Sequence, residues 1–324
     1  MSYKLVLGAG GFIGNHMVNR LKSENENVIG VDIKNTEFSE SQANEFIIGD
    51  LTNFEFVNNL LSSHEFTEIY QYAADMGGAG YIFTGENDAD VMHNSSLINL
   101  NVLKTTVEHQ DTSKVKIFYS SSACIYPENL QLEAKDVSLR ENDAYPANPD
   151  SEYGWEKLFS ERMYLAFSKN YNLNVRIARF HNIYGPLGTW NNGKEKVPAA
   201  ICRKVAEASN PGEIEIWGDG KQTRSFLYID DNIEATRRLM ESDYNLPINI
   251  GSEEMVSINE LVQIVTEISK KNISVKHIDG PQGPRGRNSD NDLIRKVLSW
   301  DYTYSLREGL ELTYSWIQQQ IKSL

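Results

Sequence analysis

The middle of the chain holds four side chains that could transfer protons: a hydroxyl, a thiol, a phenol and an amine. Cys124 closely follows Ser122, and Tyr153 precedes Lys157 by four residues. On a helix the latter spacing places both side chains on one face, where an ammonium can lower the pKa of a phenol from about 10 and make it a usable base. A thiol can exchange a proton with a carbon that a neighbouring ketone has made acidic. These residues therefore predict hydride transfer and carbon-acid proton transfer in one pocket.

A purely structural interpretation exists for each of these residues. Free cysteines are usually buried as small apolar residues, and Tyr-x-x-x-Lys spacings occur in many helices. Lys196 lies in the segment Lys194-Glu195-Lys196, which alone would indicate a solvated surface. The catalytic interpretation depends on their occurrence together, downstream of a nucleotide-binding turn.

That turn is glycine-rich and follows the apolar strand Leu5-Val6-Leu7. Glycines at 8, 11 and 14 would let the backbone approach a pyrophosphate and present the amides of the next helix, predicted over 12–21. Asp32 ends the next strand, where a carboxylate accepts both ribose hydroxyls and repels a 2′-phosphate, which favours NAD over NADP. Asp50 lies either near the adenine or in a solvated turn. The predicted cofactor contacts are Gly8, Gly11, Phe12, Ile13, Gly14, Asp32, Asp50, Leu51, Ala73, Tyr153 and Lys157.

The elements that would position these residues alternate between strand and helix. Strands are predicted at 28–31, 45–48, 68–72, 115–119 and 174–178, with helices over 97–109 and 153–169. This alternation predicts an α/β protein with a Rossmann-type, doubly wound parallel sheet. Beyond 180 the pattern changes to short strands at 213–217, 225–229, 248–250 and 274–278, and helices at 198–208, 230–241, 257–269 and 306–319.

We therefore expect an NAD-binding domain over residues 1–180. A smaller C-terminal α/β lobe over 181–324 would mainly bind substrate, with segments that can return to the first domain. The Gly- and Pro-rich stretch 279–287, which carries Arg285 and Arg287, is expected to be a loop that closes on a ligand.

The composition excludes several classes of function. The chain of 324 residues has a formal net charge of −14, which disfavours nucleic acid and anionic membranes as partners. Any anionic ligand would need a local cluster of cations. The only cysteines, Cys124 and Cys202, form no disulfide framework, and the histidines have no metal-binding spacing. With no signal peptide or membrane span in the sequence, we expect a cytoplasmic protein without a bound metal.

The residues after Ser122 distinguish among enzymes built on this pattern. Sugar-nucleotide 4,6-dehydratases have an Asp-Glu pair there and 4-epimerases have small inert residues, whereas this chain has Ala123-Cys124. Several segments resemble the GDP-mannose 3,5-epimerase family, within the extended short-chain dehydrogenases/reductases. They are Ser121-Ser122-Ala123-Cys124-Ile125-Tyr126-Pro127, Ala74-Asp75-Met76-Gly77-Gly78, Arg179-Phe180-His181-Asn182-Ile183-Tyr184-Gly185-Pro186, Trp217-Gly218-Asp219-Gly220 and Arg285-Gly286-Arg287-Asn288-Ser289-Asp290-Asn291.

The resemblance implies a transient oxidation at C4 of GDP-D-mannose by NAD, enolisation at C5 and C3, and reduction to GDP-L-galactose. Cys124 and Lys196 would be the acid/base pair, with their two roles left open, and Tyr153, Lys157 and Ser122 would act at the C4 hydroxyl. Its implied substrate contacts are Gly77, Gly78, Ser122, Ala123, Cys124, Asn182, Glu195, Lys196, Lys204, Trp217, Gln222, Arg224 and Arg285. It also implies a homodimer through the helices at 97–109 and 153–169.

Two other functions remain open. Another nucleotide-sugar epimerase, such as a 4-epimerase or an enzyme for a related GDP-hexose or heptose, would bring no solvent hydrogen into C3 or C5. A non-catalytic NAD-binding regulator would be expected to lose Tyr153 or Lys157, and both are present. Lys194, Trp155 and Ala79 replace the Arg, Leu and Met of the family, which leaves the fine substrate preference open.

Overall fold

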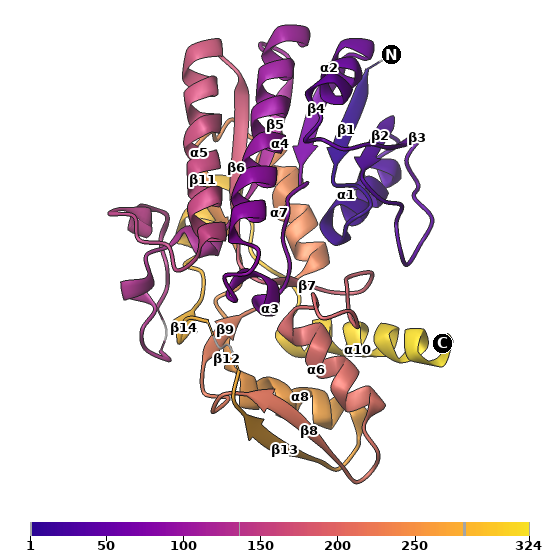
Figure 1. Ribbon diagram of the computed structural model, residues 1–324, viewed down its shortest axis with the longest axis vertical. Coiled ribbons are helices and arrows are strands. Elements are labelled where there is room, and N and C mark those ends of the chain that lie inside the picture. The colour runs from indigo at the N-terminus through magenta and orange to yellow at the C-terminus, as the bar shows by residue number, and fades with distance from the viewer. Residues whose placement is uncertain (1, 136, 281–282, 324) are drawn as a thin grey trace.

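A parallel β-sheet forms the framework of the protein. The computed structural model describes residues 2–135, 137–280 and 283–323, and within them seven strands form this sheet in the order β11-β6-β5-β4-β1-β2-β3 (Figure 1). The strands are β1 (Tyr3–Leu7), β2 (Val28–Asp32), β3 (Glu45–Ile48), β4 (Phe66–Gln71), β5 (Lys116–Ser122), β6 (Asn174–Phe180) and β11 (Pro247–Ile250). The order reverses between β1 and β4, so ligands are expected at the carboxyl ends of these strands. The predicted doubly wound sheet is confirmed.

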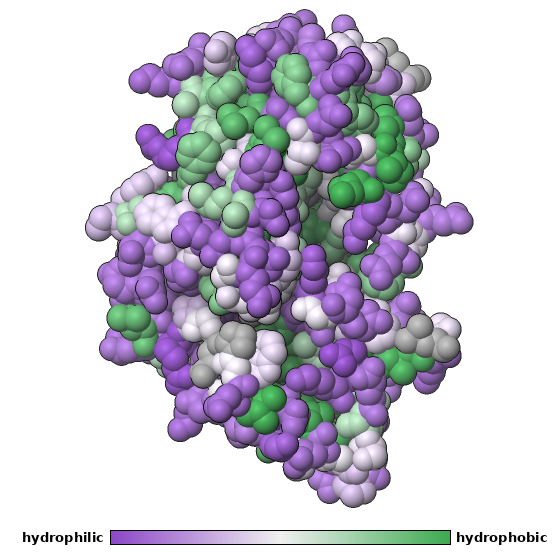
Figure 2. Space-filling view, in the orientation of Figure 1, coloured by the Kyte–Doolittle hydropathy of each residue, from purple (hydrophilic) through white to green (hydrophobic). Residues whose placement is uncertain are grey.

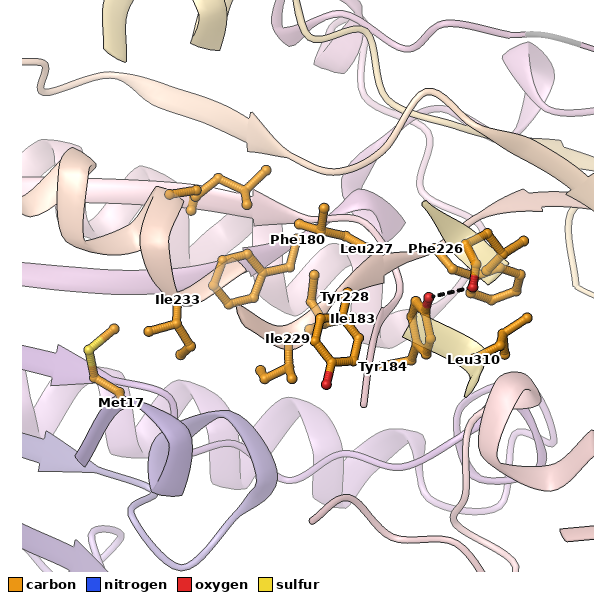
Figure 3. Packing of buried hydrophobic residues seen from close by; sticks show 14 of the residues in the cluster. Met17, Phe180, Ile183, Tyr184, Phe226, Leu227, Tyr228, Ile229, Ile233 and Leu310 are labelled. Atoms are coloured by element: carbon orange, nitrogen blue, oxygen red, sulfur yellow. Dashed lines mark hydrogen bonds between the residues drawn. The ribbon is translucent and has the colours of Figure 1, made fainter. Parts of the chain in front are cut away.

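Helices cover both faces of the sheet. One face packs against α1 (Phe12–Ser23) and α7 (Ile229–Glu241), and the other against α2 (Phe54–Ser63), α4 (Asp88–His109) and α5 (Glu152–Tyr171). Figure 3 shows Met17 of α1 and Ile233 of α7 close to Phe180 in the first of these cores. Because both faces are covered, the central strands are buried, as in other parallel sheets.

A second, smaller lobe lies beyond the carboxyl ends of the strands, in the lower half of Figure 1. Its helices are α6 (Val197–Glu207), α8 (Ile258–Ser269) and α10 (Leu306–Ser323). Its strand pairs are β8 (Gly212–Trp217) with β13 (Ile273–Ile278) and β7 (Ile183–Tyr184) with β10 (Leu227–Tyr228), and β12 (Met255–Ser257), β9 (Thr223–Ser225) and β14 (Gly286–Arg287) form a small sheet. Tyr184 joins the apolar core of this lobe, and its hydroxyl donates to the Leu306 carbonyl at 3.1 Å (Figure 3).

Three local predictions differ from the structure. The strand predicted at 225–229 is wrong, because its residues are divided among β9, β10 and the first turn of α7. Helix α4 begins at Asp88, well before the predicted start at residue 97. The prediction missed its first turns because they are polar and lack an apolar period. The predicted loop over 279–287 ends in strand β14, and its residues 281–282 lie outside the described residues. The short helices α3 (Ala79–Ile82) and α9 (Asp292–Leu298) were not predicted.

The chain crosses between the two lobes more than once. After β10, it returns through α7 and β11, and β11 pairs with β6 at the edge of the large sheet. Among the described residues, no helix combines the length and apolar character needed to span a membrane.

Candidate active site

The glycine-rich turn has the geometry of a phosphate cradle. Helix α1 starts after Gly11, which provides no side-chain cap, so its first amides are available to an anion. A β-carbon on Gly14 would come within 2.1 Å of the Gly8 carbonyl, so only glycine lets the helix begin this close to β1. A pocket next to the turn is lined by Gly10, Gly11, Phe12, Asn15, Lys34, Thr36, Glu37, Phe38, Leu187 and Thr189.

The two carboxylates predicted at the cofactor differ in their surroundings. Asp32, at the end of β2, is buried, and its oxygens accept from the Gly10 amide at 2.9 Å and the Lys34 amide at 3.2 Å. Each oxygen has a further lone pair, which suits the two hydroxyls of a ribose. Asp50 is exposed, and its Oδ1 accepts from the amide and hydroxyl of Thr52, as in a turn.

The remaining predicted cofactor contacts also lie at this edge of the sheet. Phe12 and Ile13 start α1, Leu51 follows Asp50, and Ala73 follows β4. The segment after β7 reaches the same region, because a ring nitrogen of His16 on α1 lies 3.0 Å from the Pro186 carbonyl. The turn, the buried carboxylate and the pocket therefore fit a dinucleotide.

The thiol turn follows directly from the central strand β5. Ser122 ends β5, and its hydroxyl accepts from the Cys124 amide at 3.2 Å, which caps the short 3₁₀ turn Ala123–Ile125. Helix α5 begins after Ser151 and carries Tyr153 alongside this turn. The sequence-predicted Ser122, Cys124 and Tyr153 are thus brought together.

Tyr153 and Lys157 lie on one face of α5, as predicted. The Lys157 ammonium is buried, donates to the Ser120 carbonyl at 3.0 Å and lies 5.7 Å from the centroid of the Tyr153 ring. The predicted lowering of the Tyr153 pKa is wrong for this structure. Burial raises the pKa of Tyr153, and negative charge on Cys124 raises it further, whereas Ser122 and Arg287 oppose this increase. Desolvation therefore outweighs the neighbouring donors.

Lys196 precedes α6 and belongs to the same electrostatic environment. Burial lowers the pKa of Lys196, negative charge on Cys124 opposes that shift, and the Lys157 ammonium adds to it. Cys124 and Lys196, the acid/base pair implied by the resemblance, therefore interact electrostatically with each other and with the Tyr153–Lys157 pair, although these residues are far apart in the sequence.

An arginine that was not predicted as a site residue contacts the thiol. Arg287 Nη1 lies 3.1 Å from Cys124 Sγ, and Nη2 donates to Asp150 Oδ2 at 2.9 Å. The sequence marked Arg287 as part of a turn-rich stretch and of a segment that resembles the family, but no spacing rule connects it with a residue so distant in the chain.

Further cations surround this centre. Arg224 lies in register with Arg287 on neighbouring strands β9 and β14. Burial lowers the pKa of Arg224 to about 9, and Arg287 contributes in the same direction. Arg285 forms an ion pair with Asp219 at 3.0 Å. This local cluster of cations is what an anionic ligand of a protein with net charge −14 requires.

The other predicted substrate residues have more varied positions. Trp217 is 42% exposed, whereas Gln222 is buried and its Oε1 has no hydrogen-bond partner among the described residues. The Asn182 amide donates to the Ser225 carbonyl at 3.0 Å. Gly77, Gly78 and Ala123 are buried, and Gly78 lies beside the backbone of Glu195.

Two predicted contacts are engaged elsewhere in the protein. The Glu195 carboxylate pairs with Arg203 at 2.9 Å and accepts from the Gly193 amide. The Lys204 ammonium donates to the Glu215 carbonyl at 2.5 Å, away from the thiol. Within the described ranges, no group of three or more His, Cys, Asp or Glu side chains could hold a metal ion.

Comparison with known proteins identifies the class that this fold and site define. Residues 4–251 match the NAD dependent epimerase/dehydratase family, and the chain belongs to that family. Its cofactor is NAD.

The similarity to individual relatives extends over almost the whole chain. GDP-mannose 3,5-epimerase from Arabidopsis thaliana is 45% identical over 98% of this chain and 82% of its own length. UDP-glucuronic acid 4-epimerase from Bacillus cereus, solved with UDP-glucuronic acid and NAD, is 26% identical, with a TM-score of 0.81 over 98% of this chain and 99% of its own. A UDP-glucose 4-epimerase from Thermotoga maritima, at 24% identity and a TM-score of 0.88 over 98% and 99% of the two chains, supports the fold.

Proposed function

We propose that this protein converts GDP-D-mannose to GDP-L-galactose by inverting C3 and C5. The observation that carries the proposal is the packing of α5, which holds Tyr153, against the turn of Cys124, with the charge of Lys196 interacting with that of Cys124. A 4-epimerase needs no thiol and no second proton carrier. The 45% identity with the Arabidopsis enzyme of this activity supports the same reaction and a nucleotide-sugar substrate.

Each side chain has a role that follows from its position. NAD, when bound, supplies a hydride acceptor and donor for C4. Tyr153 takes the C4 hydroxyl proton in its phenolate form, with Ser122 beside its oxygen and Lys157 fixed by Ser120; the raised pKa of Tyr153 disfavours this form in the protein without ligands. A ketone at C4 makes the hydrogens on C3 and C5 acidic, and Cys124 and Lys196 exchange protons with these carbons.

The cation cluster suits the diphosphate of the substrate. Arg224 and Arg285 have planar guanidinium groups that can bind phosphate oxygens through two hydrogen bonds. The partly exposed ring of Trp217 offers a stacking surface for the base. Asn182, Gln222, Gly77 and Gly78 would complete the contacts, and the positions of Lys204 and Glu195 favour a supporting role for these two.

The decisive experiment follows hydrogen exchange. Purified protein, NAD⁺ and GDP-mannose are incubated in D₂O, and the sugar is analysed by NMR and mass spectrometry. We expect deuterium at C3 and C5, with GDP-L-galactose as product. Cys124→Ser should abolish exchange at both carbons, whereas Cys202→Ala, a change at the other, fully buried cysteine, should retain it.

The alternatives give different isotope patterns. No deuterium in the sugar, with inversion at C4 only, would show a 4-epimerase. Exchange at C5 alone would show a C5-selective enzyme. The protein could leave GDP-mannose unchanged but exchange deuterium into a related GDP-hexose or heptose. That result would change the assigned substrate and keep the assigned chemistry.

The protein is proposed to act as a homodimer. Leu100 on α4 and Trp155 and Phe159 on α5 are 42%, 40% and 49% exposed, although all three are apolar or aromatic. Figure 2 shows hydrophobic residues interrupting the hydrophilic surface over these helices, in the upper left of the view. A second copy that packs α4 and α5 against its own would bury this face.

Two further expectations complete the proposal. Residues 1–180 would hold the cofactor and 181–324 mainly the substrate, with α7 and β11 returning to the large sheet. Two free cysteines are consistent with a reducing, cytoplasmic location, and the formal charge of −14 disfavours nucleic acid and anionic membranes as partners.

A further inference from the structure

The guanidinium of Arg287 is fixed on three sides. Its Nε donates to Gln131 Oε1, Nη2 donates to Asp150 Oδ2 at 2.9 Å, and Nη1 lies 3.1 Å from Cys124 Sγ. The Gln131 side chain is itself held, because its amide donates to the carbonyls of Tyr126 and Pro127. Arg287 is only 4% exposed, so this orientation is set by the protein.

The surroundings of Arg287 favour a negative partner at the sulfur. Removing a charge from water is costly unless the charge is paired and hydrogen-bonded. Asp150 supplies one counter-charge, at the N-terminal end of α5, and Nη1 points at Cys124. A neutral thiol is a weak acceptor, whereas a thiolate accepts a charge-assisted hydrogen bond.

We infer that Arg287 is a positioning residue, which fixes Cys124 Sγ at the sugar-binding face and stabilises its thiolate form. The inference rests on the proposed function, in which Cys124 exchanges protons with the sugar. Other groups also interact electrostatically with Cys124: the cations Lys157, Lys196 and Arg224, and the phenol of Tyr153. Arg287 is distinguished from these cations by its direct contact with Sγ, at 3.1 Å from Nη1.

The test measures thiolate reactivity without substrate or cofactor. The rate at which iodoacetamide alkylates Cys124, with loss of iodide, is followed by mass spectrometry of the intact protein. In Arg287→Gln we expect the rate near pH 7 to fall roughly tenfold to a hundredfold, the range for one charge-assisted hydrogen bond, and to approach the wild-type rate near pH 10. Arg287→Lys keeps the charge but loses the planar guanidinium with its several N–H donors. Its alkylation rate should lie between those of wild type and Arg287→Gln.

Matched variants show that the alkylation signal comes from Cys124 and depends on Arg287. Cys124→Ser should show no fast labelling, because Cys202 is fully buried. Arg307→Gln removes the same charge from an exposed arginine on α10, which is paired with Glu267 and has no role in the site, and should alkylate at the wild-type rate. Circular dichroism and thermal melting verify that each variant is folded.

Two results would overturn the inference. One is an unchanged alkylation rate in folded Arg287→Gln with a raised KM and an unchanged kcat, which would make Arg287 a substrate contact only. The other result needs no Arg287 variant. The absorbance of the Cys124 thiolate is measured as the difference between wild type and Cys124→Ser, and its appearance only in strong alkali would show that the thiolate is not stabilised. A positioning role instead predicts a lower kcat for deuterium exchange with little change in KM.

The outcomes separate this inference from the proposed function. If wild-type protein exchanges no deuterium into GDP-mannose but Arg287→Gln still slows alkylation, the arginine–thiolate pair stands and the assigned reaction falls. If exchange occurs and alkylation is independent of Arg287, the reaction stands and the positioning role falls.

Discussion

Gly154 on α5 lies directly against the carbonyl of Cys124. A β-carbon on Gly154 would come within 2.2 Å of that oxygen, which is backbone and has little freedom to move. This close approach brings the helix of Tyr153 onto the turn of the thiol. The distance between Tyr153 and Cys124 therefore depends on a glycine at position 154.

Gly154→Ala should therefore move α5, which carries Tyr153, away from the turn that carries Cys124. Overpacking of this kind costs about 1–3 kcal/mol of unfolding free energy, and we expect the rate of deuterium exchange to fall at least about tenfold. Denaturant unfolding and the D₂O assay check both effects. In Gly80→Ala the new β-carbon would lie 3.8 Å from Trp217, an ordinary contact, so unfolding should be unaffected. If folded Gly154→Ala exchanged deuterium at the wild-type rate, the close approach of Gly154 to Cys124 would not be needed for the reaction.

Asp32 and Asp50 should contribute unequally to NAD binding. Asp32→Asn removes a buried carboxylate placed for the ribose hydroxyls, and we expect NAD affinity to fall roughly tenfold or more, with NADP gaining relative to NAD. Asp50→Asn is the matched control, because that carboxylate is exposed and engaged with Thr52. Calorimetric titration measures both. A comparable loss in Asp50→Asn would instead place Asp50 at the adenine.

His181 should make the protein sensitive to acid. Burial lowers the pKa of His181 to about 3, so the folded protein favours the neutral ring. Because the folded pKa lies below the unfolded value of about 6.5, this contribution to stability is present above pH ~6.5 and is lost as the pH falls towards ~3. His181→Leu should flatten the acid limb of the stability curve by up to about 1.4 kcal/mol per pH unit.

The comparison uses slopes, because removing His181 also changes stability at neutral pH. Urea unfolding at a series of pH values gives the slope for each variant. His93 lies on the exposed surface of α4, so His93→Gln should reproduce the wild-type slope. Equal slopes for wild type and His181→Leu would show that acid unfolding has another origin.

Phe159→Glu should prevent dimerisation. The residue is 49% exposed on α5, and a carboxylate in a buried apolar interface carries a desolvation cost without a partner. Sedimentation velocity at several concentrations should show a wild-type dimer and a variant monomer. Leu132→Glu is the control, because Leu132 is 62% exposed but lies outside α4 and α5. Wild-type protein that sediments as a monomer would refute the proposed dimer.

Local patterns predicted where the cofactor-site candidates lie in the fold. The glycine turn, Asp32 and the Tyr153–Lys157 spacing each depend on short-range geometry, so their positions can be read from the sequence, whereas their contacts with NAD stay predictions. Arg287 could not be found in this way, because its contact with Cys124 joins two residues that are far apart in the chain and meet only in the folded protein. The sign of the Tyr153 pKa shift was missed for a similar reason, since burial is a property of the whole fold.

The position of β11 has a consequence for re-engineering. This edge strand comes from residues 247–250, far beyond β6, which it covers. A fragment that stopped after β6 would leave Val175 and Ile177, both buried in the intact protein, on an unprotected strand that invites aggregation. A chimaera that replaces the smaller lobe must therefore exchange two separate segments, one before α7 and one after β11. The segment from α7 to β11 has to be kept between them, because it completes the large sheet.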